Sequence, residues 1–302
     1  MQVASPQPSF ALPRVLLDPP KYNGALFQQN PDGQVKILKL SGETSPDGPP
    51  DIKDDGAVGG EVFISVNGID QDWEEHHQQI KDWWQGGFDS AGDLKRPIIG
   101  IHEGNRPGLK DQFRIFKNTM LLKQLQGGFS SPEKIQKAAY KNDPSVKAVH
   151  DQLRQNLSVG RKITLMAHSG GGSQVALAMA ILAKEDDGLW QRAISKDVRV
   201  LGTAATATRD DFRQAGVEDQ NIFLTYSPRD PVPSFYTTPT SLKKPWTLAR
   251  AVIRGLGVSL KTGFQAGPYH EGAYIFEKNL TPEGNRITRF AQGGPGGTYP
   301  LP

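Results

Sequence analysis

Cysteine is absent from this chain of 302 residues. Its absence excludes disulfide bonds, thiolate catalysis and cysteine-based zinc sites, and it fits the cytosol and export equally. No apolar run approaches the ~18–20 residues of a membrane-spanning helix, so no transmembrane segment is predicted. Residues 1–13 lack a charged start followed by an apolar stretch, so no signal peptide is predicted. This favours a cytoplasmic location, although a mature exported form stays open.

Charge of one sign is also scarce, because 35 Lys and Arg residues face 32 Asp and Glu residues, for a net charge of +3. The basic residues are scattered, so nucleic acid is not expected as a partner. The hydrophobic fraction of 36%, with 33 Gly and 23 Pro, indicates a compact core with long loops. No cofactor or metal site is expected, and the oligomeric state is left open.

Short apolar segments alternate with helical patterns and predict an α/β fold. Residues 1–20 are expected to form an extended arm, residues 21–292 the domain, and the Gly/Pro-rich residues 293–302 a flexible tail. An N-terminal β-hairpin is predicted, with Asn30-Pro31-Asp32-Gly33 as its turn. The predicted strands are 22–28, 34–40, 61–66, 97–101, 163–166, 198–201, 222–225 and 258–260, and the predicted helices are 73–84, 145–157, 173–184 and 246–256. This order predicts a mostly parallel sheet with helices on both faces.

One segment joins a short buried strand to a helix through a serine. Residues 163–166 form the strand, and Ala167-His168-Ser169-Gly170-Gly171 forms the sharp connection to the helix. This order is the nucleophile elbow, in which a strained serine between small neighbours projects its hydroxyl from the sheet edge. A phosphate-binding loop is disfavoured, because no Gly-Lys-Ser/Thr follows the glycines. The pattern predicts Ser169 as a nucleophile.

A nucleophilic serine needs an imidazole to accept its proton and a carboxylate to orient that imidazole. His270, in a turn-rich loop late in the chain, is the favoured base, and His102, after an earlier strand, is the alternative. The other histidines are expected elsewhere: His168 turned away from the serine, His76 and His77 in a polar helix, and His150 on a helix surface. Asp230, which follows the strand at 222–225, is the favoured acid, with Asp210 and Asp211 as alternatives.

An oxyanion formed at Ser169 needs two backbone N–H donors. The residue after the serine, Gly170, is expected to supply one of them. The other is expected from the loop after an early strand, where Gly68 or Ile69 follows the strand at 61–66. A glycine at this position lets the substrate approach the backbone closely.

The connection at 104–144 is far longer than the ~2–6 residues usual between a strand and a helix. Within it, apolar residues recur at helical spacing on one face (Phe113, Phe116, Met120, Leu121, Leu122 and Leu125), and basic residues form another (Lys110, Arg114, Lys117 and Lys123). Two interpretations stay open. The segment is either a cap that shapes an apolar pocket above Ser169 or an ordinary helix packed in the core.

Together, the hairpin, the strand ending in Asn67-Gly68-Ile69, the elbow, Asp230 and His270 resemble the α/β-hydrolase family over about residues 20–280. The resemblance implies that Ser169 is the nucleophile, His270 the general base and acid, and Asp230 the orienting acid. The chain departs from the family pattern at two places. Ala167 replaces the usual first glycine of the elbow, and Asn-Gly-Ile stands in place of a His-Gly-Gly-Gly motif.

A histidine before the elbow serine is common among lipases and esterases of this family. The resemblance therefore implies hydrolysis of carboxylic esters, with small-molecule or lipid esters as substrates and Phe116, Met120 and His168 as candidates for lining the pocket. Acyl transfer and amide cleavage use the same triad and are the alternatives. A further alternative is an inactive scaffold of this fold that binds a small ligand or a partner.

Overall fold

An eight-stranded sheet runs through the protein in the order β10-β7-β6-β5-β3-β4-β1-β2. The computed structural model describes residues 22–40, 60–68, 71–83, 97–104, 109–227, 275, 278–281 and 284–301. The strands are β1 (Ala25–Gln29), β2 (Val35–Lys39), β3 (Glu61–Val66), β4 (Ile98–His102), β5 (Lys162–His168), β6 (Val198–Thr203), β7 (Ile222–Tyr226) and β10 (Gly297–Pro300). β1 pairs antiparallel with β2 and β4, and the other pairings are parallel. The expectation of a mostly parallel sheet with an N-terminal hairpin is therefore confirmed.

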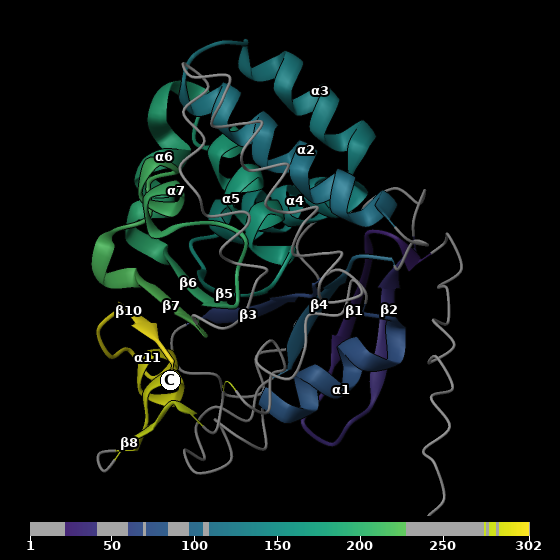
Figure 1. The fold of residues 1–302 in the computed structure, drawn as a ribbon, viewed down its shortest axis with the longest axis vertical. Helices are drawn as coiled ribbons and strands as arrows, with labels where there is room; N and C mark the ends of the chain where they lie inside the picture. The colour runs from purple at the N-terminus through teal and green to yellow at the C-terminus, as the bar shows by residue number, and fades with distance from the viewer. Residues whose placement is uncertain are drawn as a thin grey trace, which may run out of the picture.

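Helices cover both faces of this sheet (Figure 1). One face carries α2 (Leu109–Gln126), α3 (Pro132–Asn142), α4 (Pro144–Ser158), α5 (Gly171–Leu182), α6 (Leu189–Asp197) and α7 (Arg209–Gln214). The other carries α1 (Trp73–Trp83) and α11 (Arg286–Ala291). A separate two-stranded pair joins β8 (Leu280–Thr281) to β9 (Gly284–Asn285). No helix in the described part of the chain is long and apolar enough to cross a membrane.

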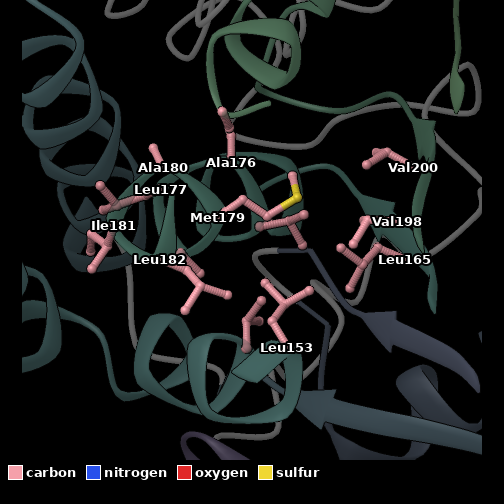
Figure 2. Close-up of a cluster of buried hydrophobic side chains, with 14 of the residues drawn as sticks. Leu153, Leu165, Ala176, Leu177, Met179, Ala180, Ile181, Leu182, Val198 and Val200 are labelled. Carbon is pink, nitrogen blue, oxygen red and sulfur yellow. The ribbon is translucent and has the colours of Figure 1, made fainter. Parts of the chain in front are cut away.

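α5 is the central helix of the larger core. All of its residues are buried, which suits a helix that is apolar on every side. Leu177, Met179 and Leu182 pack with Leu153 of α4 and with side chains of β5 and β6 (Figure 2). This packing fixes the start of α5 against the carboxyl ends of β3 and β5, where the predicted nucleophile lies.

The hairpin turn forms as the sequence predicts. Asn30 N–H donates to Gln34 O over 2.9 Å, and Gly33 N–H donates to Asn30 O over 2.9 Å. Gly33 has a φ of 87°, which is the left-handed region that glycine adopts without a side-chain clash. β2 lies at the edge of the sheet, and its Val35 and Ile37 are exposed.

The C-terminal residues differ from the flexible tail that the sequence analysis predicts. Residues 297–300 form β10, which pairs in parallel with β7 at the sheet edge. Leu301 N–H donates to Tyr226 O over 2.8 Å, and the Leu301 side chain is buried. Backbone hydrogen bonds to an open strand edge outweigh the low strand propensity of this Gly/Pro-rich segment.

The long connection at 104–144 contains α2 and α3. α2 packs on α5 and α3, with Leu121, Leu122 and Leu125 in the larger core. Phe116 and Met120 are half-buried, and Phe113 is exposed. Arg114, grouped with the lysines of the predicted basic face, is buried and ion-paired with Glu103. The leucine face therefore belongs to the core, while the Phe116 face does not.

Candidate functional site

Ser169 occupies a strained position between β5 and α5. Its φ is 49°, which is unusual for a residue with a side chain. Ala204, just after the neighbouring β6, has the same φ. Such backbone strain costs about 1–3 kcal/mol per residue and concentrates at functional sites. The strained serine that the sequence predicts at the turn between strand and helix is present in the structure.

Hydrogen bonds to the segment that leaves β6 hold this conformation in place. Ser169 N–H donates to Thr203 O over 3.0 Å. Its carbonyl accepts from Thr206 N–H over 2.9 Å, from the Thr206 hydroxyl over 3.0 Å and from Gly172 N–H over 3.1 Å. Because both backbone groups are bonded, the strained turn is a defined part of the fold.

The Ser169 side chain is buried, and its hydroxyl makes no hydrogen bond in the described part of the chain. A buried polar group without a partner is uncommon and calls for an explanation. A hydroxyl kept free for a reacting partner is one such explanation. Ser173, one turn further along, gives the contrast, because its hydroxyl donates to Gly170 O over 3.0 Å.

Two glycines fit closely around this serine. A Cβ atom on Gly68 would lie 2.6 Å from Ser169 Cβ and 3.2 Å from its Oγ, so the turn after β3 lies directly against the serine. A Cβ atom on Gly171 would lie 2.6 Å from Val66 O. Both distances are too short for any side chain. The small residue that the elbow pattern requires after the serine is therefore explained by the approach of α5 to β3.

Backbone donors near Ser169 differ in their availability. Among the described residues, Gly170 N–H forms no backbone hydrogen bond. Gly68 N–H donates to Gln71 Oε1 over 3.0 Å, so this predicted donor is engaged. Ile69, the other candidate, lies outside the described residues.

The predicted acid and base also lie outside the described residues, so Asp230 and His270 are not placed relative to Ser169. The alternative acids have other roles. Asp211 forms a capping box with Thr208 at the start of α7 and pairs with Lys123. Asp210 is exposed and accepts from Gln214 Nε2 over 2.6 Å. Asp230 stays a prediction for the acid.

Histidines cluster on the α1 face of the sheet. His76 and His77, expected in a polar helix, are buried, because α1 turns them toward β1 and β4. His76 lies between Ser65 Oγ, 3.2 Å from its Nε2, and His102 Nδ1, 3.3 Å from its Nδ1. The alternative base His102 therefore contacts α1. His168 points to Thr203, with 3.1 Å between Nδ1 and Oγ1.

Burial holds the imidazoles of His76 and His77 in the neutral form. Desolvation, followed by the charges of His102, His77 and His168, lowers the pKa of His76 well below its usual value. Desolvation, followed by His102 and Lys81, lowers the pKa of His77 to about 4. Despite this clustering, no group of three His, Asp or Glu side chains in the described residues has the geometry to hold a metal ion.

Two groups of buried polar residues were missed from the sequence. His150, expected on a helix surface, is buried with its Nε2 3.1 Å from Glu185 Oε1. Glu103, Arg114, Asp143 and Gln174 form a buried network beside the start of α5. The one signal for it was the position of Glu103, a charged residue directly after a strand.

The candidate pocket residues are only partly placed. Phe116 and Met120 are half-buried on α2, and His168 lies at the end of β5. No contact between them is described.

Comparison with protein-family models, curated proteins and solved structures finds no match to this chain. The function of the site is therefore inferred from its own geometry.

Proposed function

We propose that this protein is a serine hydrolase of the α/β-hydrolase type that cleaves carboxylic esters through an acyl-enzyme on Ser169. One observation carries the proposal. Ser169 combines a φ of 49° with a hydroxyl that makes no hydrogen bond among the described residues, at the junction of β5 and α5. A strained serine at a strand–turn–helix junction is the geometry of the nucleophile elbow.

The surroundings of the serine support this proposal. Gly170 N–H, directly after the nucleophile, belongs to the position that donates to the oxyanion in the elbow geometry. Gly68 lies close enough to Ser169 for its turn to supply a second donor, from Gly68 after release of Gln71 or from Ile69. Preorganised donors of this kind lower the energy of a tetrahedral intermediate.

Asp230 and His270 complete the proposed triad, in the order nucleophile, acid, base. His270 takes the Ser169 proton as Oγ attacks the ester carbonyl carbon. The bond to the alcohol oxygen then breaks as His270 returns the proton to that oxygen. Water, deprotonated by the same histidine, attacks the acyl-enzyme; the bond from the acyl carbon to Ser169 Oγ then breaks as His270 returns the proton to Oγ, and the carboxylic acid is released. Asp230 orients the imidazole and stabilises its charged form.

Covalent labelling with a fluorophosphonate, combined with nitrophenyl esters of graded chain length, tests the proposal. Replacing Ser169 with Ala should abolish labelling and lower kcat by ~10⁴–10⁶-fold. Ser173→Ala is the matched control, because Ser173 is equally buried in the next turn of the chain. This variant should keep both labelling and activity.

The outcomes separate the competing functions. Labelling that persists in Ser169→Ala would rule out Ser169 as the nucleophile. Labelling of Ser169 without ester hydrolysis would favour acyl transfer or amide cleavage, which amine or alcohol acceptors and anilide substrates would then distinguish. A folded wild-type protein that neither labels nor turns over substrate would favour the inactive scaffold.

A further inference from the structure

Asn67 joins the ends of two neighbouring strands beside the predicted nucleophile. It follows the last residue of β3, and its side chain is wholly buried. Its Oδ1 accepts from Glu103 N–H over 2.6 Å, and its Nδ2 donates to Glu103 O over 3.3 Å. The side-chain amide thus pairs with both backbone groups of Glu103, as a strand peptide would, where β3 and β4 end.

The same amide also holds the turn that lies on Ser169. Asn67 Nδ2 lies 3.2 Å from Gly68 O and 3.5 Å from Gln71 O, so it reaches one carbonyl on each side of residues 69–70. Gly68 is the residue on which an added Cβ would lie 2.6 Å from Ser169 Cβ. Movement of Asn67 would therefore move the backbone that faces the serine hydroxyl.

A network of buried polar and charged side chains holds the carboxylate of Glu103. Its carboxylate pairs with Arg114 of α2 and accepts from Gln174 Nε2, in the first turn of α5. Gln174 Nε2 also donates to Asp143 Oδ2 over 2.9 Å, and Asn118 Nδ2 donates to the same oxygen over 2.7 Å. All of these side chains are buried. Through Glu103, the network therefore connects Asn67 and Gly68 to α5, the helix that follows Ser169.

Such a network is poorly explained by stability alone. Two carboxylates and one guanidinium are withdrawn from water, and buried ion pairs often contribute no more than apolar residues of similar volume. What bonded polar groups supply is a fixed geometry, because each hydrogen bond restricts both partners. A geometry fixed on both sides of Ser169 is useful for aligning donors at a reacting carbonyl.

We infer that Asn67 is a positioning residue for chemistry at Ser169. It holds Gly68 against Ser169, with Glu103 as its anchor, and so fixes the backbone from which the second oxyanion donor is proposed to come. Asn67 acts through the turn and does not itself contact the substrate. This inference rests on the proposed function and adds to it a residue that sets kcat.

The test compares Asn67→Ala with Asn156→Ala, using nitrophenyl esters. Asn156 is also wholly buried and bridges Gln152 O and Arg161. It lies near the amino end of β5, whereas Ser169 follows the carboxyl end of the same strand. Molecules competent to react are counted by fluorophosphonate titration to completion. Asn67→Ala should lower kcat by ~10–100-fold with KM changed less than threefold, because misaligned donors weaken transition-state binding. Asn156→Ala should keep kcat within twofold.

A second variant covers the case in which Asn67→Ala does not fold. Asn67→Asp keeps the size of the side chain and the acceptor for Glu103 N–H, but it loses the donor to Gly68 O. Its kcat should also fall by at least ~10-fold. Values of kcat within twofold of wild type in the folded Asn67 variants would overturn the positioning role while Ser169-dependent activity stands. A wild-type protein that does not label at Ser169 would instead remove the proposed function and this inference together.

Discussion

The two faces of the sheet differ most at the carboxyl ends of its strands. Toward α2–α7 the strands present apolar side chains near these ends, such as Val66, Ile101 and Ala167, and the buried Glu103–Arg114–Asp143–Gln174 network lies beside them. Toward α1 and α11 the apolar core gives way to polar side chains. Because alternate residues of a strand share a face, Ser65, His102, His168, Thr203 and Thr225 continue the face of Phe63, Ile98, Met166, Leu201 and Phe223.

This difference separates stability from chemistry. On one face the apolar packing of α5 and the Glu103–Gln174 contact at its first turn hold the elbow, while histidine and hydroxyl side chains gather on the other. A buried polar side chain is unfavourable unless it is bonded, and most of those on the α1 face are bonded. His76 reaches Ser65 and His102, and His168 reaches Thr203. Ser169 Oγ is one of the few buried polar atoms without a hydrogen bond among the described residues, and it is the one that the proposed mechanism uses.

The largest effect is expected from a substitution of Gly68, the glycine that lies against Ser169. A methyl group on Gly68 would lie 2.6 Å from Ser169 Cβ and would displace the turn. Gly68→Ala should therefore lower kcat/KM by ~10²–10³-fold, comparable to losing an oxyanion donor. Ester hydrolysis per folded molecule measures this. Gly128→Ala is the control, because nothing lies within 4 Å of the added methyl group; its φ of 68° should cost some stability, but activity per folded molecule should stay at the wild-type level. Equal activity of the two variants would contradict the proposed placement of Gly68.

An intermediate effect separates the two sides of α2. Leu122 lies in the larger core, so Leu122→Ala should lower the free energy of unfolding by ~2–5 kcal/mol and leave chain-length preference unchanged. Phe116 is half-buried outside that core. Phe116→Ala should cost about 1 kcal/mol or less and shift the preference among nitrophenyl esters. Urea unfolding curves measure the stability of both variants, and the nitrophenyl ester series measures their chain-length preference. An unchanged chain-length preference in Phe116→Ala would contradict the cap hypothesis.

The smallest effect concerns the histidines of the α1 face. The pKa values of His76 and His77 are lowered in the folded protein, so between about 6.5 and 4.5 the unfolded chain binds protons that the folded chain does not. Stability should therefore be complete above about pH 7 and fall as the pH decreases through this window, which lies above most carboxylate titration.

Urea midpoints measured from pH 8 to pH 4.5 test this expectation. His77→Gln removes one of the two groups and should give a flatter profile. His150→Gln is a matched control, because His150 is also buried but bonds to Glu185 on the opposite face. A wild-type profile that is flat across the window would show that the α1 histidines are not held neutral by the fold.

Local patterns predicted the framework, while contacts between distant residues decided what could not be predicted. The runs at 61–66 and 163–166 indicated β3 and β5, and the turn at 30–33 indicated the hairpin. The elbow pattern pointed to Ser169, and the loop after the strand at 61–66 pointed to Gly68; the two residues lie together although they are far apart in the chain. The Glu103–Gln174 contact joins residues 71 positions apart, and no periodic pattern encodes such a pair.

Burial of charged and titratable side chains was the other feature that could not be predicted from the sequence. His76, His150 and Arg114 carry the residue types of a solvated surface, and only their partners make them interior residues. The edge strand β10 was missed for a related reason. Its sequence has little strand preference, and its conformation comes from the free edge of β7.

The pairing of β10 with β7 has a consequence for folding during synthesis of the protein. During synthesis, β7 is complete at residue 226, but the strand that covers its outer edge ends at residue 300. A nascent chain must therefore carry an unpaired edge of a parallel sheet while all of the intervening residues are made. Exposed strand edges are templates for aggregation. Residues 297–300 thus cover the outer edge of β7, and a chain shortened to end before residue 297 should associate with itself as it leaves the ribosome.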